Sequence, residues 1–106
     1  MAPSDAGRSA GSFDLRWELR RLEDRVAQAR LRPEYELLVK HALQVAAREA
    51  SRPTCDTHRV AEALARAARL LRGAGAFIGS GPMLAESLRR IAQALGPHGR
   101  TVTAAL

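Results

Sequence analysis

Large apolar residues recur at alternating intervals of four and three residues in three separate segments of the chain. Such intervals place side chains on one face of an α-helix, whereas a half-buried strand needs alternation at every second residue. Proline or glycine follows each segment and interrupts helical geometry. The three rows are Leu15, Leu19, Leu22, Val26 and Ala29; Val60, Leu64, Ala67 and Leu71; and Leu84, Leu88, Ile91 and Leu95. Three amphipathic helices are therefore predicted, each with one side available to a shared core.

A further helix is predicted over residues 33–50. Pro33 suits the first turn of a helix, and Glu34 and Glu36 complement the positive end of the helix dipole. The apolar positions of this segment cover a wide arc, as in an element that is contacted on more than one side. Alanine and leucine, with 21 and 14 of the 106 residues, also favour helix over strand.

These segments predict an all-α fold, a compact antiparallel four-helix bundle with helices at about 13–31, 33–50, 57–72 and 82–95. Short connections between the helices favour antiparallel neighbours. Gly73 is placed to end the third helix in a left-handed conformation. The predicted core comprises Leu15, Leu19, Leu22, Val26, Leu38, Ala42, Val45, Val60, Leu64, Leu71, Leu84, Leu88, Ile91 and Leu95.

The two ends of the chain are predicted to lie outside the bundle. Residues 1–12 lack an apolar periodicity and are expected to form a disordered tail. Residues 13–96 then make a single helical domain, in line with the one core that 106 residues can bury. Residues 97–106 are expected to form a flexible tail, either loose or briefly extended.

Composition argues against several classes of protein. No stretch reaches the roughly 18 continuous apolar residues of a membrane span, and the first residues lack the apolar core of a signal peptide. A soluble, cytoplasmic protein without membrane contact is therefore expected. The single Cys55 allows no internal disulfide. No cluster combines a nucleophile, a base and an orienting group, so we predict neither an enzyme nor a cofactor.

Two local motifs invite a chemical interpretation. Cys55 and His58 form a C-x-x-H pair, but zinc takes three or four protein ligands and no second pair lies at a suitable spacing. No metal site is therefore predicted. The glycines between residues 73 and 81 follow a helix rather than a buried strand, and no Lys-Ser/Thr pair comes after them. We interpret this stretch as a connection between helices, with Phe77 and Ile78 as its buried apolar anchors.

The basic residues are unevenly distributed. Lysine and arginine number 17 against 11 acidic residues, a formal charge of +6, and the excess lies in residues 57–106. Arg59, Arg66, Arg69 and Arg72 fall on the side of the third helix that faces away from its apolar row. A solvated face explains such a stripe, and so does contact with the phosphates of nucleic acid. A nucleic-acid-binding subunit is therefore the alternative function.

The first helix carries the most distinctive side chains. Phe13 and Trp17 lie nearly opposite its leucine row, beside Arg20 and Arg21. The indole is covered either by the chain itself, with Arg21 stacked on the ring, or by a partner. We therefore predict a non-enzymatic protein-interaction module, an adaptor or small assembly subunit, that binds another protein or a second copy of itself. The predicted docking residues are Phe13, Trp17, Arg20, Arg21, Phe77 and Ile78.

Two segments resemble parts of known families. The stretch from Leu43 to Leu64, with Pro53 and Thr57, is similar to the N-terminal repeat of Clp-type unfoldases, which would imply binding of substrates or adaptors. Residues 52–63 resemble the second loop and last helix of a histone fold, which would imply DNA binding or histone-fold pairing. Each resemblance covers half the chain or less, and Pro33 interrupts what would be the long central helix of a histone fold.

Overall fold

The computed structural model describes residues 14–78 and 81–106, and all regular structure within these residues is helical. It consists of α2 (Leu15–Gln28), α3 (Pro33–Ala50), α4 (Thr57–Gly73), α5 (Gly81–Ala94), the 3-10 helix η2 (Gly96–His98) and α6 (Gly99–Ala105). The all-α prediction is confirmed. The predicted total of four helices is wrong, because the C-terminal residues form the additional helix α6. The predicted disordered tail, residues 1–12, lies outside the described residues.

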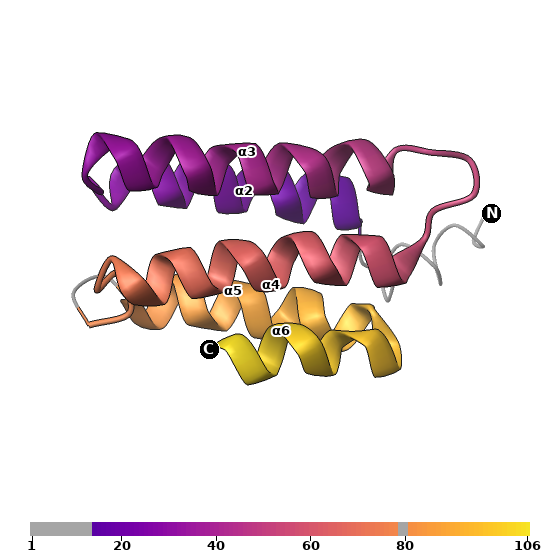
Figure 1. The fold of residues 1–106 in the computed structure, drawn as a ribbon. Coiled ribbons are helices and arrows are strands. Elements are labelled where there is room, and N and C mark those ends of the chain that lie inside the picture. Colours follow the sequence, from indigo (N-terminus) through magenta and orange to yellow (C-terminus); the bar gives the residue numbers. More distant parts are fainter. Residues whose placement is uncertain (1–13, 79–80) are drawn as a thin grey trace, which may run out of the picture.

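The helices pack side by side along their lengths (Figure 1). α2 and α3 form an antiparallel hairpin, and α4 lies along α3, with which it makes the most extensive contact. α2 also contacts α5, while the short α6 packs against both α4 and α5. As a result, α3 and α4 share one face of the molecule, with α2 and α5 behind them.

Capping side chains and a proline define where the helices begin. Asp14 caps α2, and the Asp56 carboxylate caps α4 by accepting a hydrogen bond from the His58 backbone N–H at 3.0 Å. Pro33 occupies the first turn of α3, as predicted, where its missing N–H has no helical partner to lose. The starts of these helices are therefore fixed by local chemistry that the sequence displays.

Two helix ends differ from those predicted. α2 ends at Gln28 rather than near residue 31, because Arg30 adopts a left-handed conformation with a φ of 56° that turns the chain toward α3. After α4, the left-handed residue is Gly75, with a φ of 74°, and not Gly73. The backbone N–H groups of Gly75 and Ala76 donate the two hydrogen bonds of a Schellman motif to carbonyls of the last turn.

The core contains side chains from all five of the described α-helices. The predicted core residues that are buried are Leu19, Leu22, Val26, Ala42, Val60, Leu64, Leu71, Leu84, Leu88, Ile91 and Leu95, with Leu15 half-buried against them. The prediction is wrong for Leu38 and Val45, which are 45% and 39% exposed. α3 instead buries Val39, Leu43 and Ala46, because α2 and α4 together cover only part of its wide apolar arc.

The C-terminal residues pack onto the other helices instead of forming the predicted loose tail. Val102 is fully buried and Ala105 nearly so, at the three-residue spacing that places both on one side of α6. Gly99 allows the backbone of α6 to lie close to α5, since a Cβ at this position would collide with the Ala92 carbonyl oxygen. The packed part of the chain therefore extends beyond residue 96 to Ala105.

Candidate functional site

A groove runs between α3 and α4 on the face that these two helices share. Its middle is a hollow of about 490 Å³. Its walls are formed by His41, Ala42 and Val45 of α3 and by Arg59, Glu62, Ala63 and Arg66 of α4. The depression lies where two helices of roughly equal length run side by side, so its walls are two helical surfaces.

Two further hollows extend the groove in both directions. Val45 also lines a hollow of about 300 Å³ toward the end of α3, together with Arg48, Glu49 and Arg52. Arg66 also lines a hollow of about 450 Å³ toward the end of α4, together with Tyr35, Arg69, Leu70 and Gly73. Each end hollow shares one lining residue with the middle one, and we call the three hollows together the α3–α4 groove.

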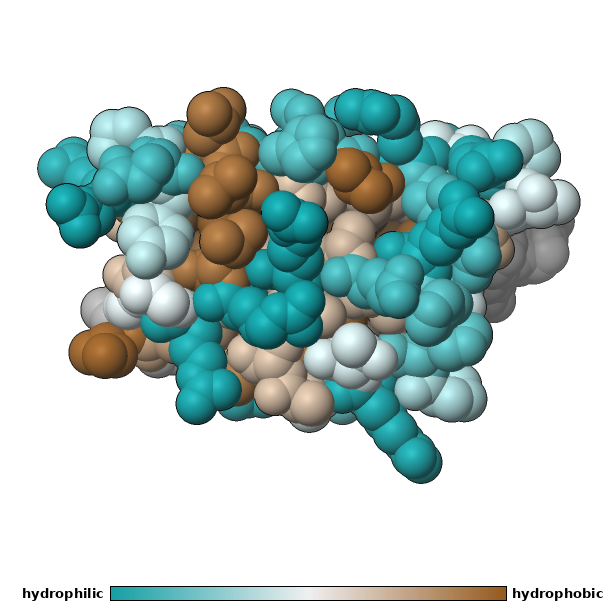
Figure 2. All heavy atoms as spheres, in the orientation of Figure 1, coloured by the Kyte–Doolittle hydropathy of each residue, from teal (hydrophilic) through white to brown (hydrophobic). Residues whose placement is uncertain are grey.

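Apolar side chains form the floor of the α3–α4 groove. Ala42 and Val45 line it from α3, and Leu38, four residues before Ala42, lies on the same side of that helix without lining a hollow itself. Ala63 and Leu70 line the groove from α4. Figure 2 shows hydrophobic surface over α3 and between the two helices, bordered by hydrophilic side chains. The free molecule therefore leaves apolar groups, above all the half-exposed side chains of Leu38 and Val45, in contact with water. Another chain could cover this surface.

Arginines form both rims of the groove. Five arginines line its hollows against two glutamates, Glu49 and Glu62. Arg52 pairs with Glu49 at 3.3 Å, and Arg59 pairs with Asp56 at 3.7 Å. Within the described residues, no acidic oxygen lies within 4.0 Å of the arginines at positions 48, 66 and 69. The rims therefore present exposed positive charge beside an apolar floor.

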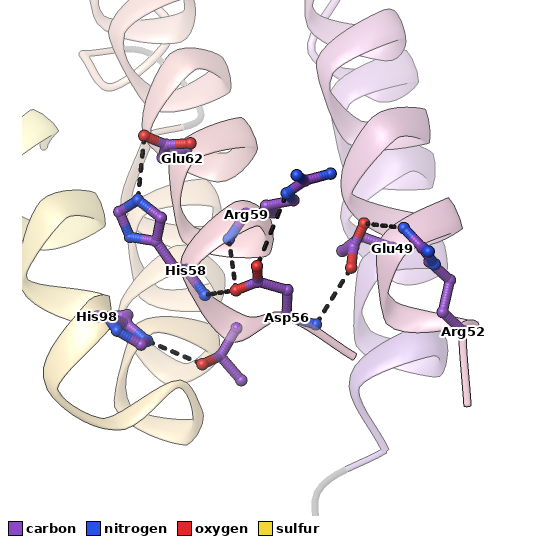
Figure 3. A network of polar contacts seen from close by, with 8 residues as sticks. Glu49, Arg52, Asp56, His58, Arg59, Glu62 and His98 are labelled. Atoms are coloured by element: carbon purple, nitrogen blue, oxygen red, sulfur yellow. Dashed lines mark hydrogen bonds and ion pairs between the residues drawn. The ribbon is translucent and has the colours of Figure 1, made fainter. Parts of the chain in front are cut away.

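One end of the groove is fixed by polar contacts in the turn between α3 and α4 (Figure 3). The buried carboxylate of Glu49 accepts hydrogen bonds from the Arg52 guanidinium at 3.3 Å and from the Asp56 backbone N–H at 3.1 Å. The pKa of the Cys55 thiol in this turn is raised. The larger cause is its slight burial, and the smaller one is the negative charge of the nearby Glu49 and Asp56 carboxylates. Glu49 thus holds the start of α4 against the end of α3.

Two histidines connect α4 to the segment before α6. His98 Nδ1 and Thr57 Oγ1 are 2.8 Å apart, and the rings of His98 and His58 meet edge to face with centroids 5.4 Å apart. His58 Nε2 also lies 3.3 Å from a Glu62 carboxylate oxygen (Figure 3). Across residues 14–78 and 81–106, no three His, Cys, Asp or Glu side chains gather in a way that could hold a metal ion. The contacts of His98 with Thr57 and His58 therefore connect η2 to the first turn of α4.

The first helix presents Trp17 to solvent, as predicted. Its side chain is 52% exposed, and the Arg21 guanidinium lies 4.8 Å from the centroid of its ring. Trp17 also lines a separate hollow of about 400 Å³ between α2 and α3. Two arginines, including Arg20, and two acidic residues line that hollow, so it shows no excess of either charge. Arg21 therefore covers part of the indole ring, and about half of the Trp17 side chain stays exposed.

The structure does not bring the remaining predicted docking residues to Trp17. Phe77 and Ile78 follow α4, at the end of the molecule opposite to the start of α2 (Figure 1). Phe77 packs partly against the core, whereas the expectation of a buried anchor is wrong for Ile78, which is 88% exposed. Phe13 lies outside the described residues. The predicted residues that the structure describes thus do not form one surface.

The predicted arginine stripe of α4 divides in the structure. Arg59, Arg66 and Arg69 line the α3–α4 groove, and all four arginines of the stripe are exposed. Arg72 does not line any of the three hollows. The sequence did not show that residues of α3, above all Val45 and Arg48, line the same groove as this stripe. The feature that could have indicated this is the apolar arc of α3, which is wider than its two neighbouring helices can cover.

Comparisons with known proteins found no relative of this chain. No known protein family, curated protein or solved structure matches the chain. The two partial resemblances in residues 43–64 therefore gain no support from a family match. None of the helices in the described residues is both long enough and apolar enough to cross a membrane.

Proposed function

We propose that the chain is a non-catalytic protein-interaction module, an adaptor or small assembly subunit, that binds an amphipathic helix of a partner protein in the α3–α4 groove. The observation that supports this most directly is the apolar row of Leu38, Ala42 and Val45, two of them half-exposed, beside rims of arginine. Apolar floors with polar borders are typical of surfaces that other chains cover.

The shape of the groove favours a helix as the occupant. Its walls are two helices, and a third helix packs against such a pair by placing its ridges in the groove between them. On α3 itself the lining extends from Tyr35 to Glu49, which corresponds to roughly 21 Å of helix. A partner helix of about 15 residues would cover this length.

The Trp17 surface is the less favoured docking site for two reasons. Its hollow is lined by equal numbers of arginine and acidic residues, so it would not select a partner by charge. Arg21 already covers part of the indole ring. In the groove, by contrast, the apolar floor has no such cover among the described residues.

Nucleic-acid binding is the competing proposal, because three arginines of the predicted stripe lie together along the groove. Phosphate contacts need exposed positive charge, and these side chains supply it. However, an apolar floor matches the apolar side chains of a protein better than a sugar-phosphate backbone. We therefore favour a protein helix and include duplex DNA in the test.

The test uses a series of labelled helical peptides that share one leucine face and differ in their flanking residues, which are glutamate, glutamine or lysine. We expect at least one peptide to bind the full chain, as measured by fluorescence anisotropy. Val45→Asp should weaken its binding roughly tenfold or more, because the carboxylate would lose water against an apolar helix.

Leu37→Asp is the matched control. Leu37 belongs to the same helix and is 71% exposed, but it does not line the groove, so its substitution should leave affinity nearly unchanged. The proposal is wrong if no peptide binds, or if the two variants weaken binding equally. If duplex DNA binds at low salt and no peptide does, nucleic-acid binding replaces the proposal.

A further inference from the structure

We infer that the partner helix is acidic, with carboxylates along both edges of its apolar face. This inference rests on the proposed function and adds the chemistry by which the groove would select its partner. Its basis is the position of the arginines relative to the apolar floor and to the acidic groups of the chain.

The arginines lie on both sides of the floor. Arg66 and Arg69 line the groove from α4, and Arg48 lines it from α3. All three side chains are exposed, and no acidic oxygen of the described residues lies within 4.0 Å of any of them. Carboxylates of a bound helix would therefore meet guanidinium groups that have no such partner among the described residues.

The acidic groups of the lining cancel only part of this charge, because two glutamates stand against five arginines. Glu49 is buried and already accepts two hydrogen bonds, one from Arg52 and one from the turn before α4. Glu62 is the other acidic residue of the lining, and its carboxylate lies 3.3 Å from the His58 imidazole. A partner with lysine or arginine beside its apolar face would thus meet mainly like charge, whereas glutamate or aspartate would meet opposite charge.

The two arginines on α4 also match the spacing of a helix. Positions 66 and 69 are three residues apart, so their side chains lie about one turn from each other. A partner helix that runs along the groove repeats its own side chains at three and four residues. Two carboxylates spaced in this way on the partner could therefore each reach one guanidinium group.

The peptide series tests this inference directly. We expect the glutamate peptide to bind roughly tenfold more tightly than the lysine peptide, with the glutamine peptide between them. Raising the salt concentration from about 50 mM to about 500 mM should weaken the glutamate peptide most, because salt screens exposed charge pairs. The order of affinities is the result that matters, since all three peptides offer the same apolar face.

The double variant Arg66→Glu with Arg69→Glu should reverse the order, so that the lysine peptide binds best. Arg89→Glu on α5 is the control, because Arg89 is exposed but does not line the groove, and it should leave the order intact. Equal binding of the glutamate and glutamine peptides would overturn the inference while the proposed function stands. Failure of all three peptides to bind would overturn the proposed function itself. Circular dichroism of each variant shows whether it remains folded.

Discussion

Cys55 shows how the turn between α3 and α4 affects a single side chain. The thiol lies one residue before the capping Asp56 and near the buried Glu49. Its slight loss of hydration and these two negative charges disfavour the thiolate, so its pKa lies above the usual value. A raised pKa means that, at a given pH below it, a smaller fraction of the thiol is in the reactive thiolate form.

Glu49→Gln should therefore make Cys55 more reactive. The substitution removes one negative charge while keeping an oxygen that can accept the Asp56 N–H, so the pKa of the thiol should fall toward its usual value. We expect alkylation by iodoacetamide to be roughly two- to threefold faster at about pH 8. The pH at half-maximal rate is the decisive measurement, because it follows the pKa of the thiol, and circular dichroism of the variant shows whether the helices remain intact. Glu62→Gln serves as the control, and an unmoved midpoint in Glu49→Gln would contradict the prediction.

At the scale of the elements, the contact between α5 and α6 depends on a glycine. The backbone of α6 begins so close to α5 that a methyl group at Gly99 would meet the Ala92 carbonyl. Gly73, the last residue of α4, has open space around the position of a Cβ. Two helical glycines thus have different surroundings, and only at Gly99 does a neighbouring helix exclude a side chain.

Gly99→Ala should lower the free energy of unfolding by about 1 to 3 kcal/mol, because α6 would have to move away from α5. Gly73→Ala should change it by less than about 1 kcal/mol, with a gain favoured by the better helix propensity of alanine. Urea denaturation of both variants measures the difference. Equal effects of the two substitutions would show that α6 does not pack as described.

The elements also show how far the sequence determines this fold. The spacing of leucines predicted α2, α4 and α5, and Pro33 predicted the start of α3. The sequence was less informative where a position is decided by neighbours. Leu38 and Leu43 are equally apolar residues of α3, and only the placement of α2 and α4 buries Leu43 and leaves Leu38 partly exposed.

The same limit explains α6 and the groove. Val102 and Ala105 form too short a row to indicate a helix by periodicity, since α6 has only seven residues and is stabilised by α4 and α5. The arginines of α4 were visible as a stripe, but their position beside an apolar floor depends on α3. A sequence pattern describes one helix at a time, whereas the groove belongs to a pair.

At the scale of the whole molecule, the two candidate surfaces are separate. Trp17 lies in the hollow between α2 and α3, whereas the groove lies between α3 and α4. The chain has a single tryptophan, so its fluorescence reports on the Trp17 surface alone. The two surfaces can therefore be distinguished in one titration.

A peptide that docks in the groove should leave the emission maximum of Trp17 unchanged, and Trp17→Ala should leave the affinity of that peptide within roughly twofold. The measurement is an emission spectrum at each point of the anisotropy titration. A shift of the maximum to shorter wavelength would show that the indole loses water on binding. Such a result would assign the docking site to α2 and contradict its placement between α3 and α4.

The rims of the α3–α4 groove carry guanidinium groups and no amines among the residues that line its hollows. Arginine stays protonated at every pH that a cell reaches, so acidification or alkalinisation cannot neutralise these rims. Lysine acetylation, a common way to erase positive charge on a protein surface, has no target among them. The arginines of this surface therefore hold their charge constant, and changes to the partner's own acidic residues or to its abundance would be one way to control its occupancy.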